Sequence, residues 1–378
     1  MRDGDFLAVL AETEHEAEAA AARLGACLGA RLAWEERDTL PDEAAMAEWL
    51  HAASQKETVI IARGEAPPAR GVAARFFRPP VAHASIGPSC AIARWEQGRV
   101  EVWSHTQGPY NLRTDMALAL RIPEEAVTIR HVEGAGCYGH NGADDMALDA
   151  ALAARAVPGR PVRVLWSRAD ELAWPPVSSA MLVEVEAALD EAGNIGAFRL
   201  EVTSNGHSSR PGRGKLPTLL AAAHLAEPFA VPPAINVSAE RGGGAQRNAV
   251  PIDRVPALRV RMRTVTEMPL RASAMRRLGA PLNVWAIESV MDELAALAGA
   301  DPLHFRLRHL DDPRAAAVLR EAAAMAGWEG RTRRGGLGWA WRWRATRTWA
   351  GGARSSPRWR RKRSCAPGGS GSPPTWGR

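Results

Sequence analysis

The sequence predicts a mixed α/β protein of the α+β class, and three observations support this prediction. Two segments, 90–104 and 181–204, alternate apolar and polar residues on either side of a turn, which is typical of β-hairpins. Other segments, such as 144–156 and 283–299, repeat apolar residues at helical spacing. The chain has 378 residues, which is enough for about two or three domains with sizeable cores.

The expected elements can be placed in order along the chain. The first hairpin turns at Gln97-Gly98, and the second turns at 190–193. Asp301 is expected to cap a helix that has Pro302 at its first position. The other expected elements are strands at 6–10, 58–62, 126–132 and 161–166 and helices at 15–28, 109–120, 144–156, 283–299 and 313–326. The stretch 211–265 is rich in Gly and Pro and receives no assignment.

Charged residues and residue types are distributed unevenly along the sequence. Residues 1–75 are typical of a partial small α/β domain, and a main domain is expected over 76–338. From residue 330 to the end there are 13 Lys and Arg and no acid, so the net charge of +6 hides an acidic first part. We therefore expect a separate basic tail over 339–378.

The tail combines arginine with tryptophan and has hardly any aliphatic residue. Disordered segments are usually poor in aromatic residues, so a solvated linker fits badly. A nucleic-acid-binding arm would use Arg on phosphates and Trp on bases. A shifted reading frame in a gene of high G+C content gives the same composition, and we favour it because nothing before residue 330 is typical of a nucleic-acid-binding protein. No nucleic-acid partner is therefore expected.

Several classes of protein are excluded. Charges and prolines interrupt every apolar run before it reaches the length of a membrane span. The N-terminus carries acids where a secretory signal needs a basic flank, so we expect a cytoplasmic protein, unless a signal upstream of this sequence directs it to the periplasm. The four cysteines stand tens of residues apart, so the chain is not expected to hold an iron–sulfur cluster of its own.

A glycine-rich loop at 134–139 spells G-x-G-x-x-G between an expected strand and an expected helix. A dinucleotide fingerprint needs this setting, so an NAD(P)-dependent dehydrogenase is one hypothesis. Against it, the loop continues to Gly142, and Asp144 and Asp145 at the helix start would repel a pyrophosphate. The preceding strand also alternates polar and apolar residues, whereas a buried parallel strand is apolar throughout. A glycine-rich turn without a ligand is the other alternative.

Five segments in one order resemble the molybdopterin-binding large subunit of the xanthine dehydrogenase and aldehyde oxidase family. Their form is most similar to bacterial nicotinate dehydrogenase and isoquinoline 1-oxidoreductase large subunits. The resemblance covers about residues 4–338, and DPLHFRLRHL at 301–310 continues it. The segments are HASIGPSCAIA at 83–93, WSHTQGPY at 103–110, GAGCYGHNGADD at 134–145, VRVLWSRADE at 163–172 and LRASAMRRLGAPLNVWAIESVMDELA at 270–295.

The resemblance implies both a fold and an activity. The fold is a mixed α/β molybdopterin-binding domain preceded by a partial, hammerhead-like domain. The activity is that of a molybdenum hydroxylase, which oxidises an N-heterocycle or an aldehyde with water as the oxygen source. The implied cofactor is a molybdenum pyranopterin in the form of molybdopterin cytosine dinucleotide. Iron–sulfur clusters would lie on a small [2Fe-2S] partner subunit, sometimes joined by a cytochrome or flavin subunit.

The resemblance also assigns cofactor-binding residues. Gln107 matches the family glutamine near the oxo ligand of the metal, where an amide N–H stabilises negative charge. Gly134, Gly136, Tyr138 and Gly139 match the glycine-rich segment beside the cofactor, in which Cys137 is an inserted residue relative to the commoner form. Arg276 matches the arginine close to the metal, and Arg277 is its competitor. His83, His105 and His140 have no metal-ligand spacing and are expected to be structural or to support the site indirectly.

One catalytic residue of the family has no counterpart here. Its general-base glutamate belongs to a second half of the large chain, and no acid follows Glu329 in this sequence. No catalytic residue is therefore assigned, and we predict a truncated, inactive form.

Overall fold

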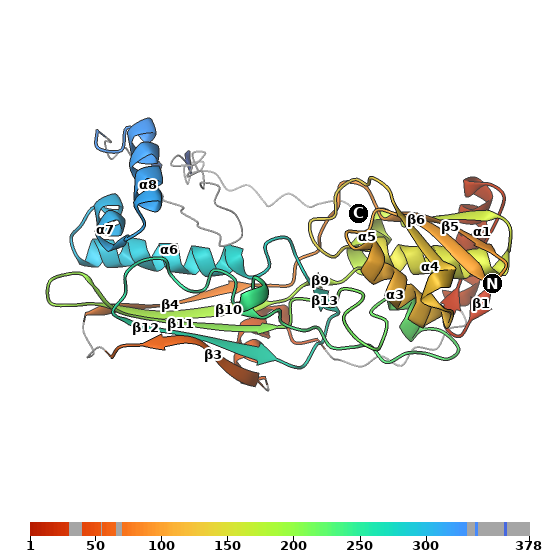
Figure 1. Cartoon of the computed structure of the whole chain (residues 1–378), viewed down its shortest axis with the longest axis horizontal. Coiled ribbons are helices and arrows are strands. Elements are labelled where there is room, and N and C mark those ends of the chain that lie inside the picture. The colour runs from red at the N-terminus through yellow and green to blue at the C-terminus, as the bar shows by residue number, and fades with distance from the viewer. Residues whose placement is uncertain (30–39, 54, 66–69, 331–336, 339–358, 361–378) are drawn as a thin grey trace, which may run out of the picture.

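The structure is a computed structural model, and it describes residues 1–29, 40–53, 55–65, 70–330, 337–338 and 359–360. It forms an elongated molecule with two lobes, each built around its own β-sheet (Figure 1). The expected tail, 339–378, lies outside the described residues except for strand β15 (Trp359–Arg360), which pairs with β14 (Leu337–Gly338). None of the described helices has the length and apolar character needed to span a membrane.

One lobe contains a four-stranded sheet in the order β7-β6-β5-β8. Its strands are β5 (Cys90–Glu96), β6 (Arg99–Ser104), β7 (Val127–His131) and β8 (Pro161–Leu165). Strands β5 and β6 form the predicted hairpin, and Gln97 and Gly98 at its turn have φ values of 49° and 78°. This pair of positive φ values suits a two-residue hairpin turn. Helices α3 (Pro109–Leu120) and α4 (Ala143–Ala156) pack against this sheet in one apolar core.

This sheet is mixed, because β6 and β7 run parallel while the other pairs run antiparallel. Val127 and Ile129 of the edge strand β7 pack into the core beneath the helices, so the alternate residues Thr128 and Arg130 point to solvent on the other face of the sheet. A dinucleotide-binding fold needs a parallel, doubly wound sheet. The dehydrogenase hypothesis for the 134–139 loop is therefore wrong.

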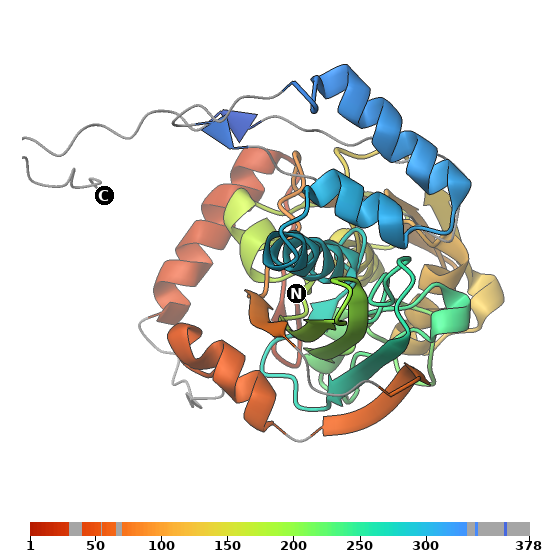
Figure 2. The same cartoon turned by 90° about the vertical axis from the view of Figure 1, so that its left-hand side faces the viewer.

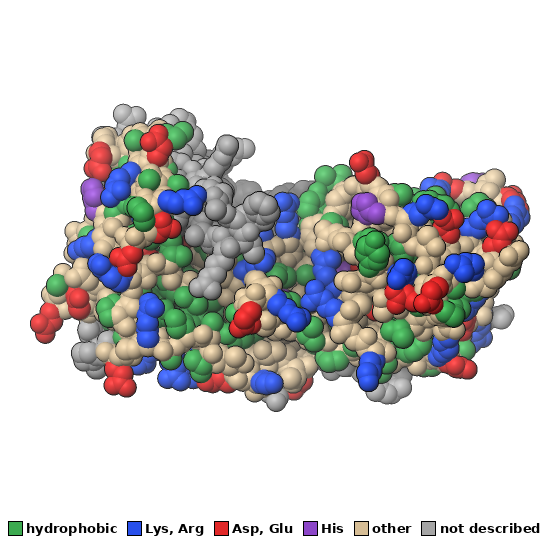
Figure 3. All heavy atoms as spheres, viewed as in Figure 1, with side chains coloured by type: hydrophobic (Ala, Val, Ile, Leu, Met, Phe, Trp, Pro, Cys, Tyr) green, Lys and Arg blue, Asp and Glu red, His purple; other side chains and the backbone are tan. Residues whose placement is uncertain are grey.

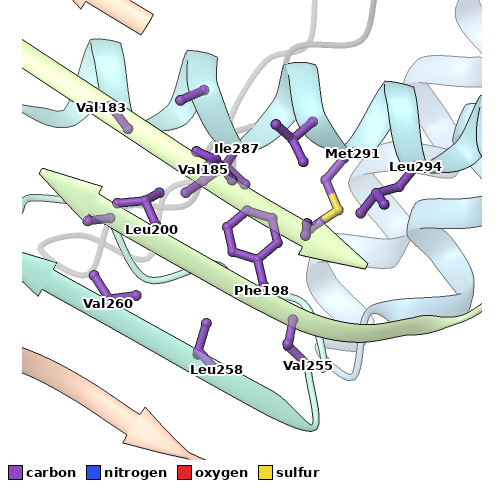
Figure 4. Packing of buried hydrophobic residues seen from close by; sticks show 14 of the residues in the cluster. Val183, Val185, Phe198, Leu200, Val255, Leu258, Val260, Ile287, Met291 and Leu294 are labelled. Carbon is purple, nitrogen blue, oxygen red and sulfur yellow. The ribbon is translucent and has the colours of Figure 1, made fainter. Parts of the chain in front are cut away.

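The other lobe contains a five-stranded sheet in the order β3-β12-β11-β10-β4. Its strands are β3 (Gln55–Arg63), β4 (Gly71–Arg78), β10 (Met181–Leu189), β11 (Ile195–Asn205) and β12 (Ala257–Val265). Helix α6 (Ala280–Leu297) lies along one face of this sheet, as Figure 2 shows nearly end-on. Ile287, Met291 and Leu294 of α6 pack on Val185 and Phe198 (Figure 4).

The opposite face of the five-stranded sheet carries cross-strand charge pairs. Alternation along β12 turns Arg261 and Arg263 to this face, where both form ion pairs with Glu201 of β11. Arg75 of β4 pairs with Glu184 of β10 in the same way. Cross-strand charge pairs therefore cover part of this face, and helix α2 (Met46–Ala52) packs on another part of it in a smaller apolar cluster with Leu182 and Val265. The main apolar core lies on the α6 side.

The first 75 residues contribute to both lobes. Strand β3 pairs with β12. Glu12 forms an ion pair with Arg160, directly before β8, and Glu14 forms one with Arg163 within β8. The strand expected at 6–10 is only β2 (Phe6–Leu7), because its partner β1 (Arg2–Asp3) has just two residues. The expected division at residue 75 stays a prediction, although strands on both sides of it share one sheet.

The helix cap expected at Asp301 is present, and the next helix has a similar cap that was not predicted. Asp301 accepts hydrogen bonds from two N–H groups at the start of α7 (Pro302–His309), and Asp312 does the same for α8 (Pro313–Ala326). The remaining elements are α1 (Glu14–Gly29), η1 (Glu43–Ala45), α2 (Met46–Ala52), η2 (Glu124–Ala126), α5 (Arg168–Ala173), β9 (Val177–Ser178), η3 (Leu220–Ala223), η4 (Ala239–Arg241) and β13 (Ala272–Ser273).

A half-buried carboxyl in α4 gives a pH-dependent prediction. Burial and the neighbouring charge of Asp145 raise the pKa of Asp149 to about 7. Because the folded state holds this proton more tightly than the unfolded state, Asp149 destabilises the protein increasingly as the pH rises from about 4 to 7. Asp149→Asn is expected to raise the free energy of unfolding by about 3 kcal/mol at pH 8 and hardly at all at pH 4, measured by urea unfolding. An equal gain at both pH values would contradict this prediction.

Candidate functional site

Two segments that are far apart in sequence pair directly where the lobes join. The glycine-rich loop between β7 and α4 meets the turn after β13, and Gly139 and Met275 form an antiparallel bridge. The backbone N–H of Arg276 donates to the carbonyl of Tyr138 at 2.5 Å, and the N–H of His140 donates to the carbonyl of Ala274 at 2.7 Å. Three of the residues singled out in the sequence, Tyr138, Gly139 and Arg276, therefore lie side by side.

Gln107 joins the same cluster from the turn that precedes α3. Its side-chain Nε2 donates to the Sγ atom of Cys137, the residue before Tyr138. The turn itself is held by Thr106, whose hydroxyl accepts from the N–H of Gly108 at 3.1 Å. The structure thus brings Gln107, the glycine-rich loop and Arg276 together, while their role toward a cofactor stays a prediction.

The glycines of the loop are required by close packing. Gly139 has a φ of 138°, and a Cβ atom on it would lie 2.0 Å from the carbonyl oxygen of Ala274. A Cβ atom on Gly136, at φ 88°, would approach the ring of Tyr138 to 2.9 Å. At Gly134 the obstacle would be the side chain of His105, at 2.6 Å. Only glycine allows the backbone to fold this tightly.

The loop presents several free backbone donors. Within the described part of the chain, the N–H groups of residues 135 to 139 donate to no protein acceptor. Gly136, Tyr138 and Gly139 have positive φ values, so this backbone is neither regular strand nor regular helix, where such N–H groups would be paired. Arg276 and Arg277 are exposed beside the loop, and basic side chains gather between the lobes on the face shown in Figure 3. The site therefore suits an anionic ligand.

A buried polar cluster supports the loop from beneath. The Nε2 atom of His140 lies 3.1 Å from a carboxylate oxygen of Asp144, and its Nδ1 atom lies 2.9 Å from the hydroxyl of Ser273. Burial raises the pKa of Asp144, but contacts with His140 and Thr106 and the nearby charge of Arg210 outweigh burial and hold the pKa below its usual value. The ionised Asp144 thus ties the loop to β13 through His140.

The three histidines considered in the sequence surround the loop. The Nε2 atom of His83 lies 3.0 Å from the carbonyl oxygen of Ala274, and His105 packs on Gly134. Burial lowers the pKa of both His83 and His105, so each is neutral at pH 7. Among the described residues no group of three or more His, Cys, Asp and Glu side chains is arranged to hold a metal ion. These histidines position backbone segments.

Sequence reasoning missed two important arginines. Arg210, in the loop after β11, donates from Nη2 to the Oε1 atom of Gln107 at 2.7 Å. Arg271 forms a two-pronged ion pair with Asp145, a residue with no exposed side-chain surface. The buried Asp145 is thus neutralised by Arg271, and it also accepts the N–H of Leu220 at 2.8 Å. The only local sign of Arg210 was its place directly after a run of small polar residues, 203–209.

Comparisons with known proteins agree with this geometry. Residues 60–240 and 247–310 match the family described as the molybdopterin cofactor-binding domain. A nicotinate dehydrogenase chain of Pseudomonas putida is 36% identical over 87% of this chain and 26% of that protein. The beta chain of isoquinoline 1-oxidoreductase from Brevundimonas diminuta is 32% identical over 67% of this chain and 30% of that protein.

Solved structures show the same fold. Quinoline 2-oxidoreductase from Pseudomonas putida has a TM-score of 0.59 and 20% identity, over 84% of this chain and 41% of that one. Aldehyde oxidoreductase from Desulfovibrio gigas has a TM-score of 0.55 and 20% identity, over 76% of this chain and 32% of that one. The chain spans between a quarter and a third of the length of the two curated relatives named above. The predicted fold is confirmed, and the chain belongs to the xanthine dehydrogenase and aldehyde oxidoreductase family, in which it carries a molybdopterin cofactor-binding domain.

Proposed function

We propose that this chain acts within a molybdenum hydroxylase and holds a molybdenum pyranopterin, in the form of molybdopterin cytosine dinucleotide, at the junction of Gln107, the 134–139 loop and Arg276. The observation that carries this proposal is the contact chain from Gln107 to Cys137 and from Tyr138 to Arg276. When bound, the molybdenum centre supplies a water-derived oxygen to an electron-poor carbon and accepts the two electrons released.

The residues present fit such a cofactor by the chemistry of their donors. Amide, guanidinium and backbone N–H groups stabilise anionic oxygen and phosphate ligands without a proton transfer. In this proposal Gln107 directs its Nε2–H to an oxygen ligand, and the free N–H groups of residues 135–139 orient the anionic cofactor. The guanidinium of Arg276 balances its charge, and the pairing of Tyr138 with Arg276 keeps these donors in one place.

The substrate proposed is an N-heterocycle or an aldehyde, which relatives named for nicotinate, isoquinoline and aldehydes support. Electrons would leave through a small [2Fe-2S] subunit, with a cytochrome or flavin subunit as a further partner.

Co-expression with a small [2Fe-2S] subunit tests the proposal. We expect the purified chain to carry molybdenum, measured by mass spectrometry, and pterin, measured by the fluorescence of its oxidised form. Arg276→Met is expected to reduce the retained molybdenum about tenfold, as changes close to metal ligands commonly do. Arg199→Met, on the exposed sheet face, is the matched control. Absence of both metal and pterin from the folded protein would refute the proposal.

A further inference from the structure

We propose that Arg210 is a positioning residue that decides which end of the Gln107 amide faces the glycine-rich loop. This inference deepens the proposed function and depends on it only for the role of Gln107 toward a cofactor. The contact itself is a property of the protein alone. Nη2 of Arg210 lies 2.7 Å from Oε1 of Gln107.

The chemistry of arginine fixes the polarity of this contact. A guanidinium carries only donors, so the Gln107 atom that faces it must be the carbonyl oxygen. The NH₂ end of the amide then points the other way, toward Cys137 and the loop, where it donates to Sγ. A glutamine without such a neighbour can exchange its two ends, because they are nearly equal in shape. Arg210 thus makes Gln107 a hydrogen-bond donor toward the site.

Arg210 is itself held firmly on both sides. The hydroxyl of Ser209 donates to the carbonyl of Ala272 at 2.9 Å, and its N–H donates to Ser273 at 3.0 Å. Two residues further on, the N–H of Gly212 donates to Asp115 of α3 at 2.7 Å. Burial lowers the pKa of Arg210 below its usual value, and the nearby charge of Asp144 offsets part of this effect. The guanidinium is thus presented to Gln107 from a fixed backbone.

Selective labelling of glutamine gives a direct measurement. The chain has four glutamines, Gln55, Gln97, Gln107 and Gln246, so ¹⁵N-glutamine labelling yields few side-chain amide signals. In Arg210→Met, which keeps the stem and removes the donors, we expect the Gln107 side-chain signal to shift or double and its hydrogen exchange to accelerate about tenfold. Arg210→Lys, which keeps a donor, is expected to restore the signal. Arg213→Met, an exposed arginine in the same loop, is the matched control.

The thiol of Cys137 gives an independent readout. In a chain whose other cysteines are replaced by serine or alanine, the Gln107 N–H that donates to Sγ and the cation of Arg210 are expected to favour alkylation of Cys137 by iodoacetamide, because both stabilise the attacking thiolate. Arg210→Met is expected to lower the alkylation rate several-fold, roughly as loss of one hydrogen bond to sulfur allows. Should this variant fail to fold, Arg210→Gln, which offers both a donor and an acceptor, provides the same comparison.

The inference would be overturned if a folded Arg210→Met or Arg210→Gln variant left both the Gln107 signals and the reactivity of Cys137 unchanged. If the side chain of Arg210 only filled space, methionine would replace it without any change in either measurement. Both measurements are made on the chain without cofactor. A chain that binds no molybdenum but shows the expected Gln107 change would refute the proposed function and support the Arg210 contact. A chain that binds molybdenum but shows no change in the Gln107 signal would support the proposed function and refute the role of Arg210.

Discussion

Replacement of Asp145 by asparagine is expected to lower the free energy of unfolding by about 3 to 5 kcal/mol, because it leaves Arg271 as an unpaired, largely buried cation. Asp145 has no exposed side-chain surface, and both of its oxygens accept from the Arg271 guanidinium. The Asp145–Arg271 ion pair also joins the start of α4 to the residue directly before β13, and Arg276 lies shortly after β13 in the same segment. Urea unfolding followed by circular dichroism measures the change.

The matched control is an exposed ion pair of the same type. Glu186→Gln removes the partner of Arg199, and both side chains are 68% exposed, so we expect a loss of less than about 1 kcal/mol. A double variant, Asp145→Asn with Arg271→Met, is expected to lose less than the sum of the two single variants, because neither charge is then left alone. Equal losses for Asp145→Asn and Glu186→Gln would contradict the burial argument.

Much of the fold follows from local pattern in the sequence. The hairpin at Gln97-Gly98 needs positive φ at both turn positions, and the caps at Asp301 and Asp312 each depend on a side chain two or three residues from its partner. Strand β12 was not predicted, because its neighbours Gly and Pro obscure its alternation and its pairing with β11 and β3 joins distant segments. Local pattern does not determine such pairing.

The residues of the candidate site could be predicted only in segments whose sequence resembles a known family. The cluster of Gln107, Tyr138 and Arg276 follows from three such segments, each with a specific order of residues. Arg210 and its partner Gln107 are 103 residues apart, and Arg271 and Asp145 are 126 apart. No spacing rule links residues at that distance, so both contacts emerge only when the two lobes and the loops between them are built.

The substitution with the largest expected effect on the site itself is Gly139→Ala. Its Cβ atom would lie 2.0 Å from the backbone oxygen of Ala274, and a φ of 138° is one that side chains rarely adopt. The two effects together are expected to lower the free energy of unfolding by about 3 to 5 kcal/mol or to break the bridge to Met275 locally. Either result separates Tyr138 from Arg276.

Gly98→Ala separates the two causes, because Gly98 has a φ of 78° and no atom within 4 Å of its added Cβ. We expect this control to lose only about 1 kcal/mol, the cost of a left-handed conformation alone. Local opening at Gly139 would be detected as faster hydrogen exchange of the Arg276 and His140 N–H groups, whose acceptors are Tyr138 and Ala274. If Gly139→Ala is no less stable than Gly98→Ala and keeps both N–H groups protected from exchange, the backbone pairing does not hold the site together. The positions of Gln107, the loop and Arg276 must then depend on the buried His140 and Asp144 beneath the loop.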